Sequence, residues 1–180
     1  MAVELFEKTI GSETVYRGKI VNLRVDEVEL PNGNNTRREV VEHGGAVAVV
    51  PINEKNEVLM VRQYRYPVGK VLLEIPAGKL EKGEDPAACA ARELEEETGF
   101  KAGSMKHLFS FYSTPGFTNE ILYLYLAGGL THLGIHPDED EFIQLHYVPL
   151  ERALEMVDRG EICDAKSIIG ILAAKREIDK

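Results

Sequence analysis

Residues 78–100 of the chain read GKLEKGEDPAACAARELEEETGF, a stretch that ends in a dense group of acids. Asp85 can cap a helix that begins at Pro86, where the missing N–H costs nothing, and Gly99 can end that helix. The stretch therefore predicts a helix over residues 86–98. Four of the six residues in Arg92–Glu97 are glutamates, all near the end of that helix.

These glutamates oppose the helix that carries them. Negative charge near a helix C-terminus is unfavourable by about 0.3–1 kcal/mol for each exposed group, and Glu93 and Glu97 also repel each other at positions i and i+4. Arg92 compensates only part of this charge. A solvated acidic face is one interpretation. A divalent cation is the sharper one, because Mg²⁺ and Mn²⁺ prefer carboxylate oxygens as ligands.

The spacing of residues around the glutamates separates the two interpretations. Five residues stand between Gly78 and Glu84, and seven more precede Arg92. This pattern resembles, at every defined position, the signature of the Nudix hydrolase family. The matching positions are Gly78, Glu84, Arg92, Glu93, Leu94, Glu96, Glu97, Gly99 and Phe100.

The resemblance implies a metal-dependent hydrolase that cleaves a pyrophosphate linkage in a nucleotide derivative. The cofactor would be Mg²⁺ or Mn²⁺, with two or three ions in each site. Structural positions of the motif would be Gly78, which permits close approach of a neighbour, Glu84, which can bond to free N–H groups or to Arg92, and Gly99. The implied metal ligands are the side chains of Glu93, Glu96 and Glu97 and the backbone carbonyl of Ala77.

Three stretches outside the motif resemble the ADP-ribose pyrophosphatase subgroup. Pro115 lies sixteen residues after Gly99, and residues 37–47 and 63–79 also look like their counterparts there. The resemblance implies hydrolysis of ADP-ribose to AMP and ribose 5-phosphate. The same chemistry on a nucleotide sugar, NADH or a dinucleoside polyphosphate stays open, as does a non-catalytic ligand sensor.

An acidic loop at residues 138–141 lies where the subgroup carries a catalytic loop. Matched residue by residue, Glu139 would be the general base that activates water and Glu141 a further metal ligand. Solvated charge before an edge strand is the alternative. Some family members use a glutamate of the helix as the base, which makes Glu96 or Glu97 the competitor.

Substrate contacts are expected from arginines and aromatic residues. A guanidinium binds two phosphate oxygens at once, so Arg38 and Arg65 are candidates for the pyrophosphate or the terminal ribose, and ion pairs within the sheet are their alternative role. Aromatic side chains that could stack on adenine, or else belong to the core, are Tyr16, Tyr64 and Phe117. Pro115 is the remaining substrate-side candidate.

The pattern of elements predicts a Nudix-type α/β/α sandwich with a mixed β-sheet, in the α/β (α+β) class. Strands are expected at 13–16, 22–30, 38–42, 46–52, 57–64, 106–112, 120–127 and 142–148, and further helices at 150–159 and 165–177. The expected division is an N-terminal antiparallel β segment, residues 1–42, and a Nudix domain, residues 43–180. By resemblance the N-terminal segment exchanges between subunits, which implies a homodimer.

Composition excludes several classes of protein. The formal charge of −9 repels a phosphate backbone, so nucleic acid is not an expected partner. The two cysteines, Cys89 and Cys163, fit no disulfide or zinc spacing and are expected to be packing residues. The apolar stretches are too short to cross a bilayer, which excludes a membrane partner and favours a cytoplasmic protein.

Overall fold

The computed structural model describes residues 5–134 and 142–180. The described residues form two compact units. The first unit holds the residues up to Gly45 together with Tyr112–Ile121, and the second holds Ala46–Phe111 and Leu122–Lys180. Residues 112–121 join the first unit because their backbone bonds to its last strand, as in the 2.8 Å bond from the Val41 N–H to the Phe117 carbonyl.

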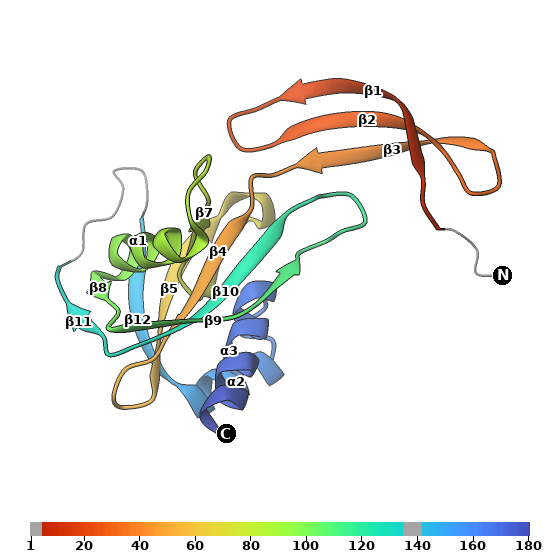
Figure 1. Cartoon of the computed structure of the whole chain (residues 1–180). Coiled ribbons are helices and arrows are strands. Elements are labelled where there is room, and N and C mark those ends of the chain that lie inside the picture. The colour runs from red at the N-terminus through yellow and green to blue at the C-terminus, as the bar shows by residue number, and fades with distance from the viewer. Residues whose placement is uncertain (1–4, 135–141) are drawn as a thin grey trace. The chain divides into compact units, whose positions relative to one another are not determined.

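The first unit is an antiparallel sheet of three strands in the order β1-β2-β3, drawn in red and orange in Figure 1. A tight turn joins β2 to β3, and Gly33 in that turn has a φ of 82°, which a glycine adopts at little cost. This confirms the predicted antiparallel β segment, although β1 begins five residues earlier than expected. The strands are β1 Lys8–Arg17, β2 Asn22–Glu29 and β3 Asn35–Glu42.

The second unit is built around β4, whose six residues are all buried. β4 pairs in parallel with β10 and antiparallel with β7, so its sheet is mixed, as predicted. The sheets have the orders β7-β4-β10-β9, β12-β5-β6 and β11-β8. The strands are β4 Ala46–Pro51, β5 Glu57–Arg65, β6 Lys70–Glu74, β7 Ala77–Lys79, β8 Phe100–Lys101, β9 Ser104–Tyr112, β10 Ile121–Gly128, β11 Thr131–His132 and β12 Gln144–Pro149.

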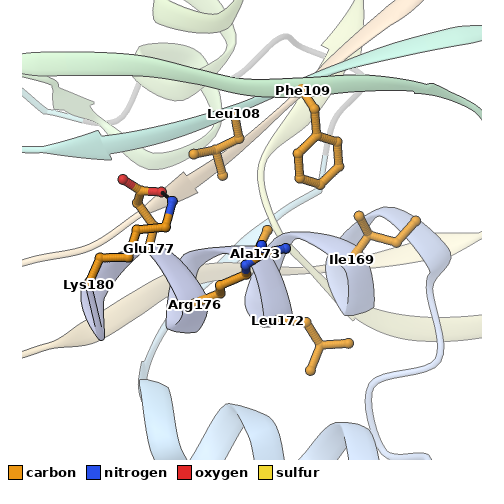
Figure 2. A pocket seen from close by; sticks show the side chains of 8 residues that line it. All are labelled: Leu108, Phe109, Ile169, Leu172, Ala173, Arg176, Glu177 and Lys180. Carbon is orange, nitrogen blue, oxygen red and sulfur yellow. Dashed lines mark hydrogen bonds and ion pairs between the residues drawn. The ribbon is translucent and has the colours of Figure 1, made fainter.

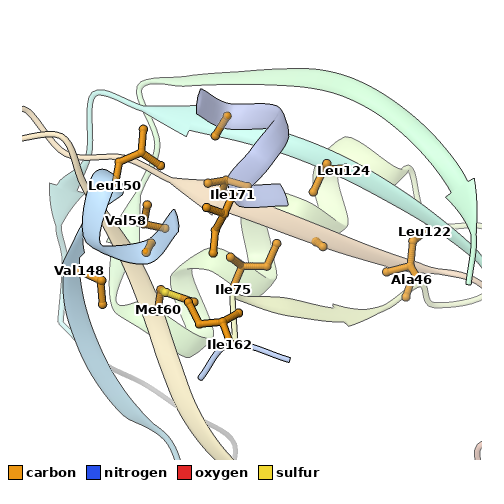
Figure 3. Close-up of a cluster of buried hydrophobic side chains, with 14 residues drawn as sticks. Ala46, Val58, Met60, Ile75, Leu122, Leu124, Val148, Leu150, Ile162 and Ile171 are labelled. Carbon is orange, nitrogen blue, oxygen red and sulfur yellow. The ribbon is translucent and has the colours of Figure 1, made fainter. Parts of the chain in front are cut away.

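Helices cover both faces of the mixed sheet (Figure 1). Val47 and Val49 of β4 pack in one buried cluster with Leu94 of α1. Ala48 and Val50 belong to a second cluster, which includes Ile171 of helix α3 (Figure 3 labels Ile171). Successive side chains of a strand point to opposite faces, so α1 and α3 lie on opposite faces of β4. The helices are α1 Pro86–Thr98, α2 Leu150–Asp158 and α3 Ala165–Ile178, and a 3-10 turn, η1, covers Tyr66–Val68.

Close packing holds α3 against the sheets. A Cβ at Gly170 would lie 2.8 Å from the Ile75 side chain and 2.9 Å from that of Val50, so only glycine allows this approach. Beside β9, the same helix borders a groove of ≈ 490 Å³ with a floor that includes Leu108 and Ala173 (Figure 2). Because α3 and α1 cover opposite faces, this groove lies on the face away from the acidic helix.

Two smaller expectations have mixed outcomes. Cys89 is fully buried, which confirms its packing role, but Cys163 is exposed, so the same expectation is wrong there. Cys163 stands in the turn before α3, where the chain returns to the surface.

In the ranges 5–134 and 142–180, the helices are too short or too polar to cross a membrane.

Candidate metal centre

Local sequence signals fix both ends of α1. One carboxylate oxygen of Asp85 accepts hydrogen bonds from the backbone N–H groups of Ala87 (3.0 Å) and Ala88 (3.1 Å). Gly99 has a φ of 73°, and its N–H donates to the Glu95 carbonyl at 2.8 Å. Leu94 is fully buried and anchors the helix to the sheet. The glutamates of α1 are therefore presented from a rigid element.

Arg92 is the cation at the centre of this acidic group. Its Nε donates to Glu84 at 3.0 Å, and its Nη1 donates to Glu93 at 2.7 Å and to Glu96 at 2.9 Å. The bond to Arg92 is the largest cause that lowers the pKa of Glu84, to about 2, and the acids in turn raise the pKa of Arg92. One positive charge thus serves three carboxylates, and the network keeps an excess of negative charge.

Glu93 explains the glycine at position 78. A Cβ on residue 78 would lie 1.8–2.1 Å from the carboxylate atoms of Glu93, which is closer than any real contact. The Glu93 carboxylate therefore occupies the space that a side chain would fill. The glycine at position 78 thus leaves room for the Glu93 side chain against the backbone of β7.

Glu97 lies deeper than the other acids of α1, with 5% of its surface exposed. Its Oε2 accepts a hydrogen bond from the backbone N–H of Ala77 at 3.0 Å. Ala77 is placed there by β7, which pairs it with Ala48 of β4. The short strand thus brings the backbone of Ala77 against the acidic helix.

The donor set fits a hard divalent cation. Carboxylates from one helix face lie beside the Ala77 backbone, and all of these donors are oxygens. Within residues 5–134 and 142–180, no three His, Cys, Asp or Glu side chains already stand in a metal-binding arrangement. Arg92 binds Glu93 and Glu96. The expected Glu139 and Glu141 lie outside the described residues.

Arg65 ends β5 and forms an ion pair with a buried acid. Its Nε and Nη2 donate to the two carboxylate oxygens of Glu74, each at 2.8 Å, and Glu74 is 1% exposed. Glu97 also lies near enough to contribute to the raised pKa of Arg65, after the larger effect of Glu74. The alternative role as an ion-pair partner is therefore confirmed for Arg65, and Glu97 of the acidic helix lies within electrostatic reach of its guanidinium.

The remaining expected substrate residues lie in the first unit, except Tyr64. Arg38 binds both carboxylate oxygens of Glu7, at 2.8 and 2.9 Å, so it too forms an ion pair. Tyr16 is 58% exposed and Phe117 is 53% exposed, so the alternative of a core role is wrong for both. Pro115 is exposed as well, in the loop that follows β9. Tyr64 belongs to the second unit and is 56% exposed, which excludes a core role there too.

Sequence reasoning missed a second charged cluster, around Glu74. Lys166, in the first turn of α3, donates to the same Glu74 oxygen as Arg65 and also lies 3.0 Å from Asp164. One signal was available, since Glu74 is an acid inside the apolar run Leu72–Ile75. Its partner lies 92 residues away, and no local pattern joins the two.

Comparisons with known proteins agree with this geometry. A family model described as the NUDIX domain matches residues 42–168, and a model of the nucleoside diphosphate sugar hydrolase N-terminal domain matches residues 7–41.

Two curated relatives cover most of the chain. The methanol dehydrogenase activator of Bacillus methanolicus is 50% identical over 92% of this chain and 90% of its own. The ADP-ribose pyrophosphatase of Bacillus subtilis (strain 168) is 47% identical over 93% and 91%. Among solved structures, an ADP compounds hydrolase matches with a TM-score of 0.88 over 99% of this chain and 97% of that one, and at 21% identity this likeness shows the fold.

Proposed function

Because this chain belongs to the Nudix family, we propose that it hydrolyses the pyrophosphate bond of ADP-ribose to AMP and ribose 5-phosphate. One observation carries the proposal: Arg92 is shared by three acids, and Glu97 of the same helix bonds to the backbone of Ala77. The substrate is supported by the name of the B. subtilis relative at 47% identity.

The proposed metal ligands are Glu93, Glu96, Glu97, Glu141 and the Ala77 carbonyl. Two or three Mg²⁺ or Mn²⁺ ions would neutralise the pyrophosphate and polarise the phosphorus under attack. This cationic help is needed because the chain carries a formal charge of −9 and its substrate is an anion.

In the reaction, Glu139 would accept a proton from the attacking water, with Glu96 as the competing base. The water oxygen forms a bond to one phosphorus, the bridging P–O bond breaks, and the second phosphate leaves on the other product. Arg65 would bind a phosphate oxygen with the part of its guanidinium that Glu74 does not engage. Arg38, Tyr16, Pro115 and Phe117 are the proposed contacts from the first unit.

Release of AMP from ADP-ribose, with and without Mg²⁺, tests this function. GDP-mannose, NADH and diadenosine polyphosphates at equal concentration serve as competitors. Fast metal-dependent turnover largely confined to ADP-ribose is the expected result. Faster turnover of another substrate would contradict ADP-ribose as the substrate, and no turnover of any would favour a ligand sensor.

We also propose that residues 1–42 form a separate segment that exchanges between two subunits of a homodimer and completes each site, beside a Nudix domain at residues 43–180. The match of residues 7–41 to an N-terminal domain model supports a distinct segment. Mixing two variants that should each be inactive, Glu97→Gln and Arg38→Ala, provides a test. If the segments exchange, a mixed dimer has one intact site, in which the unaltered Nudix domain of one subunit meets the unaltered segment of the other.

Random exchange would make about half of the dimers mixed, with one of their two sites intact, so about a quarter of the wild-type activity should return. No recovery after subunits have demonstrably exchanged would show that each segment serves its own subunit. Sedimentation velocity gives the oligomeric state in the same samples.

A second candidate function rests on the relative from B. methanolicus, whose name describes an activator of a dehydrogenase. At 50% identity this chain could likewise act on a partner enzyme. The test is to add the purified chain to a methanol dehydrogenase and to measure the rate of the dehydrogenase, with Glu97→Gln as the matched inactive control. Stimulation by the wild type and none by the variant would support the second candidate.

We propose a cytoplasmic location as well. Its support is that Cys89 and Cys163 are both free thiols, a state that a reducing compartment maintains. Fractionation of cells that express the chain at natural levels tests this location.

A further inference from the structure

Glu74 is the most deeply buried carboxylate described in the second unit, and two cations share it. Arg65 binds both of its oxygens, and Lys166 adds a third bond to Oε2, the oxygen that Arg65 Nη2 also uses. A buried carboxylate needs a partner because it has lost its water. Arg65 alone would neutralise this charge, so the ion pair does not by itself explain Lys166.

Lys166 stands in an unfavourable place for a cation. It lies in the first turn of α3, where the helix dipole disfavours positive charge, and its side chain is only 13% exposed. Asp164, the cap of the same helix, lies 3.0 Å from its Nζ and balances the extra charge. The position is understandable if the task of Lys166 is to hold the Glu74 carboxylate in one orientation.

The orientation of Glu74 determines that of Arg65. Two parallel bonds fix the guanidinium in the plane of the carboxylate. They engage Nε and Nη2, while the Arg65 side chain keeps 38% of its surface exposed, and Glu97 of the acidic helix lies within electrostatic reach. The orientation of Arg65 Nη1 therefore depends on the ion pair with Glu74, and Lys166 of α3 binds that same Glu74.

The first turn of α3 also holds Ile75, the residue that follows Glu74 in the chain. The backbone N–H of Ile75 donates to Ser167 Oγ at 2.9 Å, and that hydroxyl donates to Asp164 at 2.6 Å. Two residues further on, the Ala77 N–H bonds to Glu97. The start of α3 therefore fixes the segment that links Arg65's partner to the backbone of the candidate metal centre.

We propose that Lys166 is a positioning residue of the active site, which acts through Glu74 to hold Arg65 ready for a phosphate of the substrate. This inference rests on the proposed function, because Arg65 is there a substrate contact. Lys166 itself touches no substrate. Its effect should therefore appear in substrate binding and should pass entirely through Arg65.

Steady-state kinetics with ADP-ribose test this proposal. Lys166→Met should raise KM about tenfold, the size of one lost bond to a charged group, with kcat changed less than about twofold. Lys166→Arg should restore most of the wild-type KM. Lys175→Met is the matched control, because Lys175 lies on the same helix and pairs with Glu151 and Asp179 at the surface.

A double substitution separates positioning from a merely structural role. In an Arg65→Met background, adding Lys166→Met should leave KM unchanged, because the route from Lys166 to the substrate is already broken. Additive effects would overturn the proposal. So would a Lys166→Met variant that melts earlier but keeps the wild-type KM.

The Arg65 Nε–H signal in an NMR spectrum gives a readout that needs no turnover. It is identified by its loss in Arg65→Met. In Lys166→Met it should exchange with water faster than in the wild type or Lys175→Met, and unchanged exchange would overturn the proposal. If the wild type cleaves no ADP-ribose, the proposed function fails, while this signal still reports whether Lys166 holds Arg65.

Discussion

Two clusters of acids in the second unit differ in how their charge is balanced. Around Arg92, one guanidinium serves Glu84, which precedes α1, and Glu93 and Glu96 near the C-terminal end of that helix. Around Glu74, two cations face two acids, since Arg65 and Lys166 are balanced by Glu74 and Asp164. In the first cluster one cation is shared by three acids, whereas in the second the two charges are matched one to one. Excess charge thus distinguishes a candidate metal centre from a network that holds side chains in place.

The largest effect should come from removing Glu97, the most buried acid of α1. Glu97→Gln can keep the bond from the Ala77 N–H but loses its charge, so turnover should fall by about a hundred- to a thousandfold with little change in stability. Glu95→Gln is the matched control, since Glu95 lies on the same helix and is not among the proposed metal ligands. Equal activity of the two variants would remove Glu97 from the proposed ligands.

Gly78→Ala should separate the site from the fold. The new Cβ would displace the Glu93 carboxylate, a flexible end that can move, so we expect activity to fall about tenfold to a hundredfold, as for a disturbed metal ligand. Stability should hardly change. Both kcat/KM and the unfolding midpoint of the variant are compared with those of the wild type. Full activity of the variant would show that the position of the Glu93 carboxylate does not matter for turnover.

Arg92→Met should reveal the excess charge directly. Without the cation, the remaining acids repel one another, so we expect a loss of about 1–2 kcal/mol in unfolding free energy without metal. Mg²⁺ should then stabilise this variant more than it stabilises the wild type, because binding to the folded state adds to its stability. Arg152→Met, which removes an exposed pair with Glu155, is the control. Equal stabilisation by Mg²⁺ in all three proteins would contradict the idea that Arg92 offsets negative charge at a Mg²⁺ site.

A smaller effect should appear with pH. Because Arg92 lowers the pKa of Glu84 from its ordinary 4.5 to about 2, their pair stabilises the fold fully above pH 4.5. This contribution should decline as the pH falls from about 4.5 toward 2. Metal-free unfolding of the wild type and Glu84→Gln should therefore differ more at pH 6 than at pH 3. A constant difference would mean that Glu84 titrates alike in both states.

The acidic helix could be predicted from sequence because its determinants are local. Asp85, Pro86 and Gly99 set its ends at the residues where the structure has them. The strands β6 and β7 were not predicted, since three to five residues carry too little pattern and their pairing is decided by β5 and β4. Yet β7 is the strand that brings Ala77 to the candidate site.

The Glu74 cluster shows the same limit of prediction from sequence, here for contacts between side chains. Arg65 and Glu74 lie nine residues apart, but Lys166 joins them only through the packing of α3. Likewise, residues 112–121 belong with the first unit because of backbone bonds to β3 that no spacing reveals. Motifs with fixed spacing are visible in a sequence, whereas partners that tertiary packing brings together are not.

Calorimetric titration of the protein with Mg²⁺ tests most directly whether the unbalanced acids of α1 form a metal centre. The wild type and Glu95→Gln should bind Mg²⁺ with the same affinity, and Glu97→Gln should bind at least about tenfold more weakly. Binding by Glu97→Gln as tight as that of the wild type would contradict the account.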